Sequence, residues 1–191
     1  MRKVNLITSN LGKLREFKAA LEPLGFEVVH LDVEVDEVQA DTLEEVVAGC
    51  MRQLRSRGVK DFVIDDSGLF VDALRGFPGV YSSYALRTLG CEGLLKLMQG
   101  VQDRRARFEC CVGCSLEGMR DIVLKERCEG RILEAGRGEE GFGFDPIFAA
   151  EGEGRSFAEM PLDEKNLISH RGKAIKSLAI QLQMRKGGKG E

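Results

Sequence analysis

Apolar residues recur along the chain with two spacings, one typical of helices and one typical of strands. Leucine, phenylalanine and alanine recur at helical spacing between Lys13 and Leu21, and the same period returns in three later segments. Thr42 and Glu45 have the spacing of a capping box, which favours a helix start at this point. The pattern predicts helices over Lys13–Leu21, Leu43–Arg57, Tyr84–Met98 and His170–Gln183.

Short apolar runs and alternating segments predict the strands. Two long alternating segments follow one another in the second half of the chain, whereas strands and helices alternate before them. This order indicates an α/β fold with a mixed β-sheet flanked by helices. The predicted strands are Val4–Ile7, Glu27–Leu31, Phe62–Ile64, Ala106–Leu116, Ile122–Cys128 and Pro146–Phe148.

Two of the predicted helices begin with positive charge. A helix start exposes free N–H groups and the positive end of the helix dipole, so cations are disfavoured in its first turn. Lys13 nevertheless follows the polar turn Thr8–Asn10, and His170 and Arg171 open the last helix after Ser169, which can cap it. Either these cations are simply solvated, or the two helix starts bind one multiply charged anion.

The first of these turns matches neither common phosphate-binding motif. A Walker loop needs glycine where Ile7 stands and serine or threonine where Leu14 stands, and the segment contains no G-x-G-x-x-G pattern. Thr8 and Asn10 would instead offer a hydroxyl and an amide, with Lys13 as a point charge on phosphate.

Length and charge limit the classes of function. The chain has 191 residues, a length typical of one domain, and 28 basic against 31 acidic residues give a net charge of −3. This balance argues against non-specific nucleic-acid binding, which needs a broad basic surface. Because no apolar run approaches the length of a membrane span or a signal peptide, we expect a cytoplasmic protein without a membrane partner.

Six cysteines are therefore expected to be thiols. Cys111 and Cys114 have the C-x-x-C spacing of some metal and redox sites, with Cys110 beside them. In a strand, however, residues three apart face opposite sides. We expect these cysteines to be structural.

Asp65 and Asp66 follow a short apolar run and precede Ser67 and Gly68. Adjacent carboxylates repel one another unless a cation or a proton lies between them, and Mg²⁺ is the cation that prefers such oxygen ligands. The alternative is an acidic turn with solvated charges, since Asp-Ser-Gly is common in turns.

A third candidate segment is GFGFD, residues 141–145. Glycines free the backbone around Phe142 and Phe144, and aromatic rings in such a setting suit stacking on a planar base. Both rings could instead belong to the core, which is the preferred interpretation for Phe144.

Five motifs together resemble the inosine triphosphate pyrophosphatase family, also called XTP/dITP diphosphatases. They are TSNLGKLREF, IDDSGL, FPGVYSSY, GFGFDPIF and DEKNLISHRGKA, and the resemblance covers about Lys3 to Leu182. It implies Mg²⁺-dependent hydrolysis of deaminated purine nucleoside triphosphates (ITP, dITP, XTP) to the monophosphate and pyrophosphate. It also implies a homodimer and one domain over 1–185, with a tail over 186–191. An elongated sheet would form two lobes around a central nucleotide-binding cleft.

The resemblance also implies roles for individual residues. The catalytic carboxylate is Asp66, which also binds the metal with Glu37, and Glu34 and Asp36 are alternatives for that second acid. Ser9 stands where many members have glycine, and Phe144 where tyrosine or tryptophan is frequent. The implied substrate contacts are Thr8, Ser9, Asn10, Leu11, Gly12, Lys13, Ser67, Phe142, Gly143, Phe144, Asp145, Lys165, His170 and Arg171.

Two other functions stay open at this point. One is a pyrophosphatase with a different nucleotide preference, including pyrimidines. The other is a nucleotide-sensing or RNA-contacting module that binds without hydrolysis. Such a module would not need Asp65, Asp66 and Glu37, and its affinity should survive removal of Mg²⁺.

Overall fold

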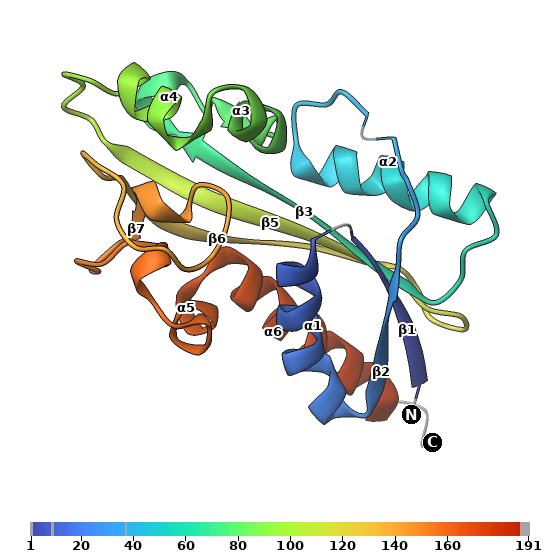
Figure 1. The fold of residues 1–191 in the computed structure, drawn as a ribbon. Coiled ribbons are helices and arrows are strands. Elements are labelled where there is room, and N and C mark those ends of the chain that lie inside the picture. Colours follow the sequence, from blue (N-terminus) through green and yellow to red (C-terminus); the bar gives the residue numbers. More distant parts are fainter. Residues whose placement is uncertain (1, 9, 37, 188–191) are drawn as a thin grey trace. The chain divides into compact units, whose positions relative to one another are not determined.

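The computed structural model describes residues 2–8, 10–36 and 38–187, and it has the α/β fold expected from the sequence (Figure 1). Within these residues one mixed sheet of seven strands has the order β2-β1-β3-β5-β6-β7, with β4 paired to β3. The strands are β1 (Arg2–Ile7), β2 (Phe26–Leu31), β3 (Phe62–Val71), β4 (Pro78–Gly79), β5 (Arg105–Ser115), β6 (Ile122–Ile132) and β7 (Phe148–Ala150).

Six α-helices in the described ranges accompany the sheet. They are α1 (Leu11–Leu21), α2 (Leu43–Ser56), α3 (Ser82–Thr88), α4 (Gly90–Leu97), α5 (Leu162–Ile168) and α6 (His170–Gly187). Four short 3₁₀ helices connect them: Glu22–Leu24, Asp72–Leu74, Asp145–Ile147 and Phe157–Glu159. No helix in these ranges is both long enough and apolar enough to cross a membrane.

Three sequence-based predictions differ most from the structure. The single helix predicted over Tyr84–Met98 is two helices, because Gly90 adopts a positive φ of 65° that ends one helix and begins the next. β3 does not end at Ile64 but continues through the Asp-Asp-Ser-Gly segment to Val71. The strand predicted over Pro146–Phe148 begins only at Phe148, after a 3₁₀ turn.

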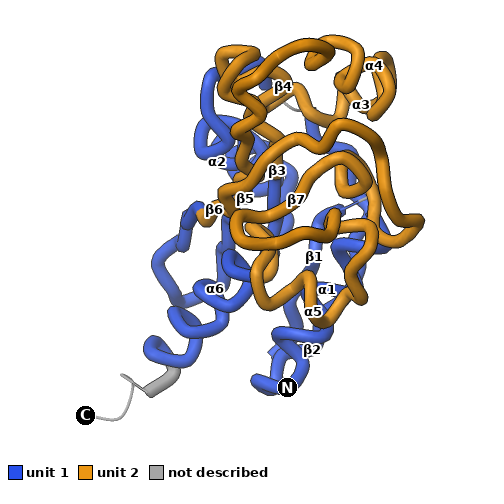
Figure 2. Tube along the Cα trace, turned by 90° about the vertical axis from the view of Figure 1, so that its left-hand side faces the viewer, with its two compact units in different colours: residues 1–66, 111–125, 173–191 blue, residues 67–110, 126–172 orange. Residues whose placement is uncertain are grey.

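The chain divides into two compact units (Figure 2). Unit 1 contains residues 1–66, 111–125 and 173–191, and unit 2 contains residues 67–110 and 126–172. The long strands β3, β5 and β6 contribute residues to both units.

Unit 1 is built on parallel strands. β1 pairs in parallel with β2 from Arg2↔Phe26 to Ile7↔Leu31 and, on its other side, with the start of β3. α2 packs against β5 at Gly113, where a Cβ atom would lie 2.5 Å from the sulfur of Met51. Only glycine therefore allows this close approach. The capping box of Thr42 and Glu45 is confirmed and fixes the start of α2.

Unit 2 has its own apolar core, in which side chains of β5 alternate. Ala106 and Phe108 point into a buried cluster that also contains Phe148 and Phe157. Phe108 contacts Phe148 edge to face, with ring centroids 4.7 Å apart. This cluster supports the segments that carry the unit-2 residues of the candidate site.

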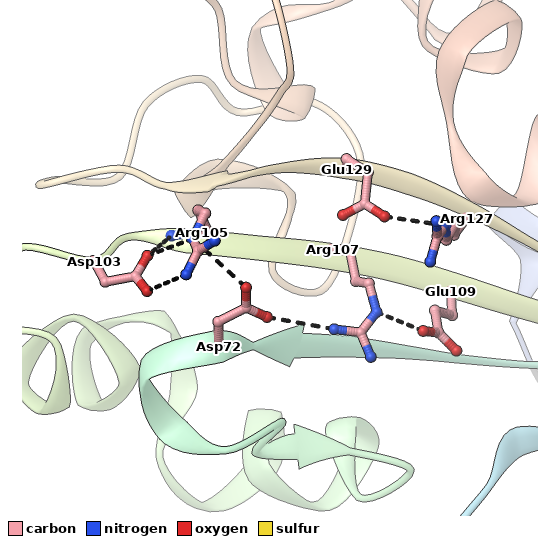
Figure 3. Close-up of polar contacts among 7 residues, drawn as sticks. All are labelled: Asp72, Asp103, Arg105, Arg107, Glu109, Arg127 and Glu129. Carbon is pink, nitrogen blue, oxygen red and sulfur yellow. Dashed lines mark hydrogen bonds and ion pairs between the residues drawn. The ribbon is translucent and has the colours of Figure 1, made fainter.

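The opposite face of β5 and β6 in unit 2 carries charged side chains that pair with one another (Figure 3). Arg107 contacts Glu109 at 2.6 Å, and Arg105 contacts Asp103 at 2.7 Å. Arg127 on β6 likewise pairs with Glu129 at 3.0 Å. Since each of these arginines has an acidic partner, this face is not the basic groove that RNA binding would need.

Candidate functional site

A pocket of about 490 Å³ lies in unit 1, at the carboxyl ends of β1 and β2. Parallel strands place their carboxyl ends at one edge of a sheet, which is where ligands of α/β proteins commonly bind. The volume is within the usual range for small-molecule sites. The lining residues are Ile7, Thr8, Lys13, Asp32, Val33, Glu34, Val35, Cys50, Ile64 and Asp65.

Lys13 and Asp65 form an ion pair inside this pocket. The Lys13 Nζ atom lies 3.2 Å from Asp65 Oδ2, and it also donates to the Asp65 backbone carbonyl at 3.2 Å. The Asp65 side chain is fully buried. Lys13 thus neutralises Asp65, and the expected Mg²⁺ between Asp65 and Asp66 stays a prediction. An anionic ligand of the pocket would have to share Lys13 with Asp65.

The start of α1 is capped by its own sequence. The Asn10 side chain accepts hydrogen bonds from the backbone N–H groups of Gly12 at 2.8 Å and Lys13 at 3.3 Å. The Thr8 hydroxyl accepts from the Asn10 N–H at 3.0 Å. Two of the free N–H groups on which the anion hypothesis relied are therefore already satisfied. Among the described residues of this segment, Thr8 and Lys13 line the pocket.

Acidic oxygens are the groups with which this pocket could hold a hard cation. Asp32 and Glu34 line the pocket with Asp65, whereas Asp36 lies 3.9 Å from Arg57 and its backbone bonds to Gln53. Carboxylates are suitable ligands for Mg²⁺. In the described residues, however, no three His, Cys, Asp or Glu side chains form a ready-made metal cage. The carboxylate oxygens of the pocket therefore suit a hard cation such as Mg²⁺, with phosphate oxygens of a bound ligand completing its coordination.

Of these acidic pocket residues, Asp32 was not predicted, and Asp65 was predicted only as a possible Mg²⁺ ligand beside Asp66. Asp32 stands directly after β2, and Asp65 precedes the predicted catalytic Asp66. A sequence signal existed for both, because each follows or ends the apolar run of a parallel strand. Asp66 is half-buried on β3, and alternation along the strand directs it to the face opposite Asp65.

In unit 2, a buried ion pair holds the GFGFD segment. Lys165 Nζ lies 2.7 Å from Asp145 Oδ2, and both side chains are less than 5 % exposed (3 % and 4 %). The same carboxylate oxygen accepts the Phe142 backbone N–H at 2.8 Å. Gly141 must be glycine here, since a Cβ atom would lie within 3.2 Å of three Asp145 side-chain atoms. Asp145 is thus an organising residue of the loop.

Two cations of unit 2 lie near the Phe142 ring. The Lys165 ammonium lies 4.9 Å from its ring centroid, and the Arg171 guanidinium carbon lies 5.0 Å from it. Arg171 also donates to the Ser67 hydroxyl at 3.2 Å. A base stacked on Phe142 would share the ring with these cations.

The start of α6 is where the sequence placed it. α6 begins at His170, and the Ser169 hydroxyl accepts the Gly172 N–H at 3.0 Å, so Ser169 caps the helix as expected. The His170 ring stacks on Phe108 with centroids 4.6 Å apart. His170 and Arg171 are both buried, which shows that these first-turn cations are not solvated surface residues.

The remaining predicted site residues have varied positions. Leu11 is 64 % exposed, Gly143 has a positive φ of 70°, and Phe144 is buried in the unit-2 core, as preferred from the sequence. Ser9 and Glu37 lie outside the described residues. The substrate roles of all these residues stay predictions, as does the convergence of Lys13 and Arg171 on one ligand.

Cys111 and Cys114 are thiols, as expected, and their structural role stays a prediction. Cys111 and Cys114 are free, buried thiols of unit 1, and burial raises the pKa of each to about 12. For Cys111 the nearby Glu44 carboxylate raises the pKa further. Thiols with such pKa values are poor nucleophiles and metal ligands at neutral pH.

Comparison with known proteins gives the family. Proteins named dITP/XTP pyrophosphatase from Pyrococcus horikoshii and Thermococcus kodakarensis are each 49 % identical to this chain. The first match covers 92 % of this chain and 94 % of the relative, and the second covers 95 % and 97 %. The solved structure of the Staphylococcus aureus Ham1 protein has a TM-score of 0.84 at 32 % identity, covering 96 % of this chain and all of that one. The profile of the Ham1 family matches residues 4–181, and the chain belongs to this family.

Proposed function

We propose that this protein hydrolyses deaminated purine nucleoside triphosphates, namely dITP, XTP and ITP, to the monophosphate and pyrophosphate. The observation that carries the proposal is the unit-1 pocket, in which Lys13 and Thr8 face acidic side chains. A triphosphate needs cationic and hydroxyl donors, and a hydrolase of triphosphates needs carboxylates for a metal ion and for water. The names of the relatives from Pyrococcus and Thermococcus support the same activity.

The proposed reaction is attack of water on the α-phosphorus. The water oxygen forms a bond to this phosphorus while the bond from phosphorus to the oxygen bridging to the β-phosphate breaks. Asp66 orients the water and accepts its proton, and pyrophosphate leaves with the negative charge. Lys13 and Lys165 are proposed to contribute by positioning the substrate and stabilising its developing charge.

Mg²⁺ is the proposed cofactor, and it would neutralise charge on the triphosphate oxygens. The residues proposed to hold it are Asp66 and one acid of the 34–37 segment. Glu37 is proposed from the family resemblance. Glu34 is the alternative; it lines the pocket together with Asp65, whereas Asp66 is not one of the lining residues.

Base selectivity is proposed to come from the first turn of α6. Inosine and xanthine carry an oxygen at C6, whereas adenine carries an amino group. Buried donors at His170 and Arg171 would satisfy the oxygen but oppose the amino group, and a mismatch of this kind can discriminate by about 10⁴-fold. An Arg171→Ala variant that kept the full preference for ITP over ATP would contradict this assignment.

A panel of nucleoside triphosphates assayed for pyrophosphate release tests the proposal. We expect dITP, XTP and ITP to be hydrolysed far faster than ATP, GTP and pyrimidine triphosphates. A preference for pyrimidines would favour the other pyrophosphatase, and tight binding without turnover, unaffected by EDTA, would favour a sensing module.

Asp66→Asn and Asp65→Asn form a matched pair for the proposed chemistry. Asp66→Asn should lower kcat by more than tenfold with the fold intact, because the proton acceptor is lost. Asp65→Asn should act mainly on KM, because it removes the ionic partner of Lys13. An Asp66→Asn enzyme with more than about a tenth of the wild-type kcat, a change of about 1.4 kcal/mol, would remove Asp66 from the base role.

A homodimer in the cytoplasm is also proposed. Five large apolar side chains of unit 2 between residues 77 and 97 are at least 39 % exposed: Phe77, Tyr81, Tyr84, Leu89 and Leu97. Exposed aromatic residues of this kind are enriched in protein interfaces. Light scattering of the wild type and of Tyr84→Arg tests this proposal, since the variant should shift a dimer toward the monomer.

A further inference from the structure

His30 contacts the phosphate-binding turn proposed above, although it belongs to none of the motifs that indicated the family. It lies on β2 in unit 1, and its side chain is exposed. Its Nε2 atom is 2.6 Å from the backbone carbonyl oxygen of Thr8. Thr8 lines the pocket, but His30 does not. Any effect of His30 on a ligand of the pocket would therefore act through Thr8.

The position of Thr8 explains why its carbonyl group needs such a partner. The parallel pairing of β1 with β2 ends at Ile7↔Leu31, so Thr8 is the first residue beyond the paired strands. Beyond that point the ladder no longer supplies donors to the backbone carbonyls. A side chain of the neighbouring strand replaces the missing backbone donor at this place.

The contact also determines the state of the imidazole ring. A carbonyl oxygen only accepts hydrogen bonds, so the nitrogen that faces it at 2.6 Å must carry a proton. His30 is thus a donor through Nε2–H, whether the ring is neutral or charged. The hydroxyl of Thr8 accepts the Asn10 N–H, and the Asn10 side chain in turn accepts the Lys13 N–H at the start of α1. A continuous series of hydrogen bonds joins His30 to the start of α1.

We infer that His30 is a positioning residue, which fixes the Thr8 carbonyl and so orients the Thr8–Asn10 turn for a polyphosphate. This inference rests on the proposed function of the pocket. His30 touches no reacting atom in this scheme and is not catalytic. Since the turn would bind the phosphates equally in the ground state and in the transition state, loss of the donor should act on KM and leave kcat nearly unchanged.

Two substitutions separate the donor from the bulk of the ring. His30→Phe keeps a planar ring without a donor, and His30→Gln places an amide N–H near the position of Nε2. A net hydrogen bond of ordinary strength predicts that His30→Phe raises KM for dITP about three- to tenfold, with kcat within about twofold of the wild type. His30→Gln should restore KM to within about twofold. Glu27→Gln is the matched control, since Glu27 is also exposed on β2.

Two readouts do not depend on turnover. Inorganic tripolyphosphate, titrated calorimetrically, should bind His30→Phe about three- to tenfold more weakly than the wild type or His30→Gln. Nitrogen-15 NMR of the ring should report a protonated Nε2 for His30. The chain has two histidines, so the spectrum of His30→Gln assigns the signals.

The outcomes are distinguishable. Equal tripolyphosphate affinity in wild type and His30→Phe, or equal loss in His30→Phe and His30→Gln, would overturn the inference. An unprotonated Nε2 would do the same. A wild type that releases no pyrophosphate from any triphosphate would contradict the proposed function. In that case the tripolyphosphate affinities and the ring NMR would decide the role of His30 alone.

Discussion

Removing one partner of the Asp145–Lys165 pair should strongly destabilise the protein. The two side chains lie 2.7 Å apart and are 4 % and 3 % exposed, so Asp145→Asn would leave a buried ammonium without its counter-ion. Breaking a buried pair in this way typically costs about 3–5 kcal/mol. The Phe142 and Phe157 rings, 4.9 and 5.6 Å from the Lys165 ammonium, would offset part of this cost. We therefore expect a loss of about 3 kcal/mol.

Urea and thermal unfolding measure this loss. A change of about 3 kcal/mol should lower Tm by about 6–12 °C in a protein of this size. The double variant Asp145→Asn/Lys165→Met removes both charges and should lie within about 1 kcal/mol of the wild type. Glu117→Gln is the control, because the exposed Lys60–Glu117 pair should contribute less than about 1 kcal/mol.

Two results would refute this reasoning. One is a loss below about 1 kcal/mol for Asp145→Asn, which would mean that the ammonium is not desolvated. The other is a double variant as unstable as the single one, which would mean that the cost arises from the altered hydrogen bond to the Phe142 N–H rather than from the buried charge.

Two further predictions concern backbone geometry and pH. Gly172→Ala should lower both stability and kcat, because the new Cβ would overlap the Asn166 carbonyl oxygen and the backbone shift that relieves this overlap would displace Arg171. Unfolding and steady-state assays measure the two effects. Wild-type values in both assays would contradict the prediction. The free energy of unfolding should fall as pH rises from about 9 to about 12. In the unfolded protein the thiols of Cys111 and Cys114 ionise near their ordinary pKa, whereas in the folded protein they keep their protons up to a pH of about 12. Urea unfolding at pH 8 and 10 measures this loss, and the Cys111→Ala/Cys114→Ala variant should lose less; an equal loss would contradict the assignment.

The sequence predicted most of the elements because its local signals agree with the fold. The capping box at Thr42 and the cap at Ser169 fix the starts of α2 and α6 without help from distant residues. The alternation of residues 106–116 correctly indicated that Cys111 and Cys114 face different surroundings. At these places the residues close in sequence were sufficient to predict the local structure.

The sequence could not show which charges meet in space. The cation of Lys13 suggested an external anion, but its first partner is Asp65, 52 positions later in the chain. Asp145 was predicted as a substrate contact, and this role stays a prediction, but no motif showed that its carboxylate holds Lys165 and the Phe142 N–H. The contact of His30 with Thr8 depends on the parallel register of β1 and β2, which no motif encodes.

The helix break at Gly90 shows another limit of periodicity. Apolar residues continue at helical spacing through residues 84–98, and a glycine within such a pattern is often tolerated. Here its positive φ redirects the chain, so that two short helices replace one. The apolar pattern predicted the helical segment but not its interruption.

In the proposed reaction, water attacks the α-phosphorus of a deaminated purine triphosphate. Hydrolysis of dITP in ¹⁸O-labelled water, followed by mass spectrometry of the products, tests it most directly. We expect one ¹⁸O atom in the nucleoside monophosphate and unlabelled pyrophosphate. Label in pyrophosphate or orthophosphate, or a diphosphate product, would contradict it.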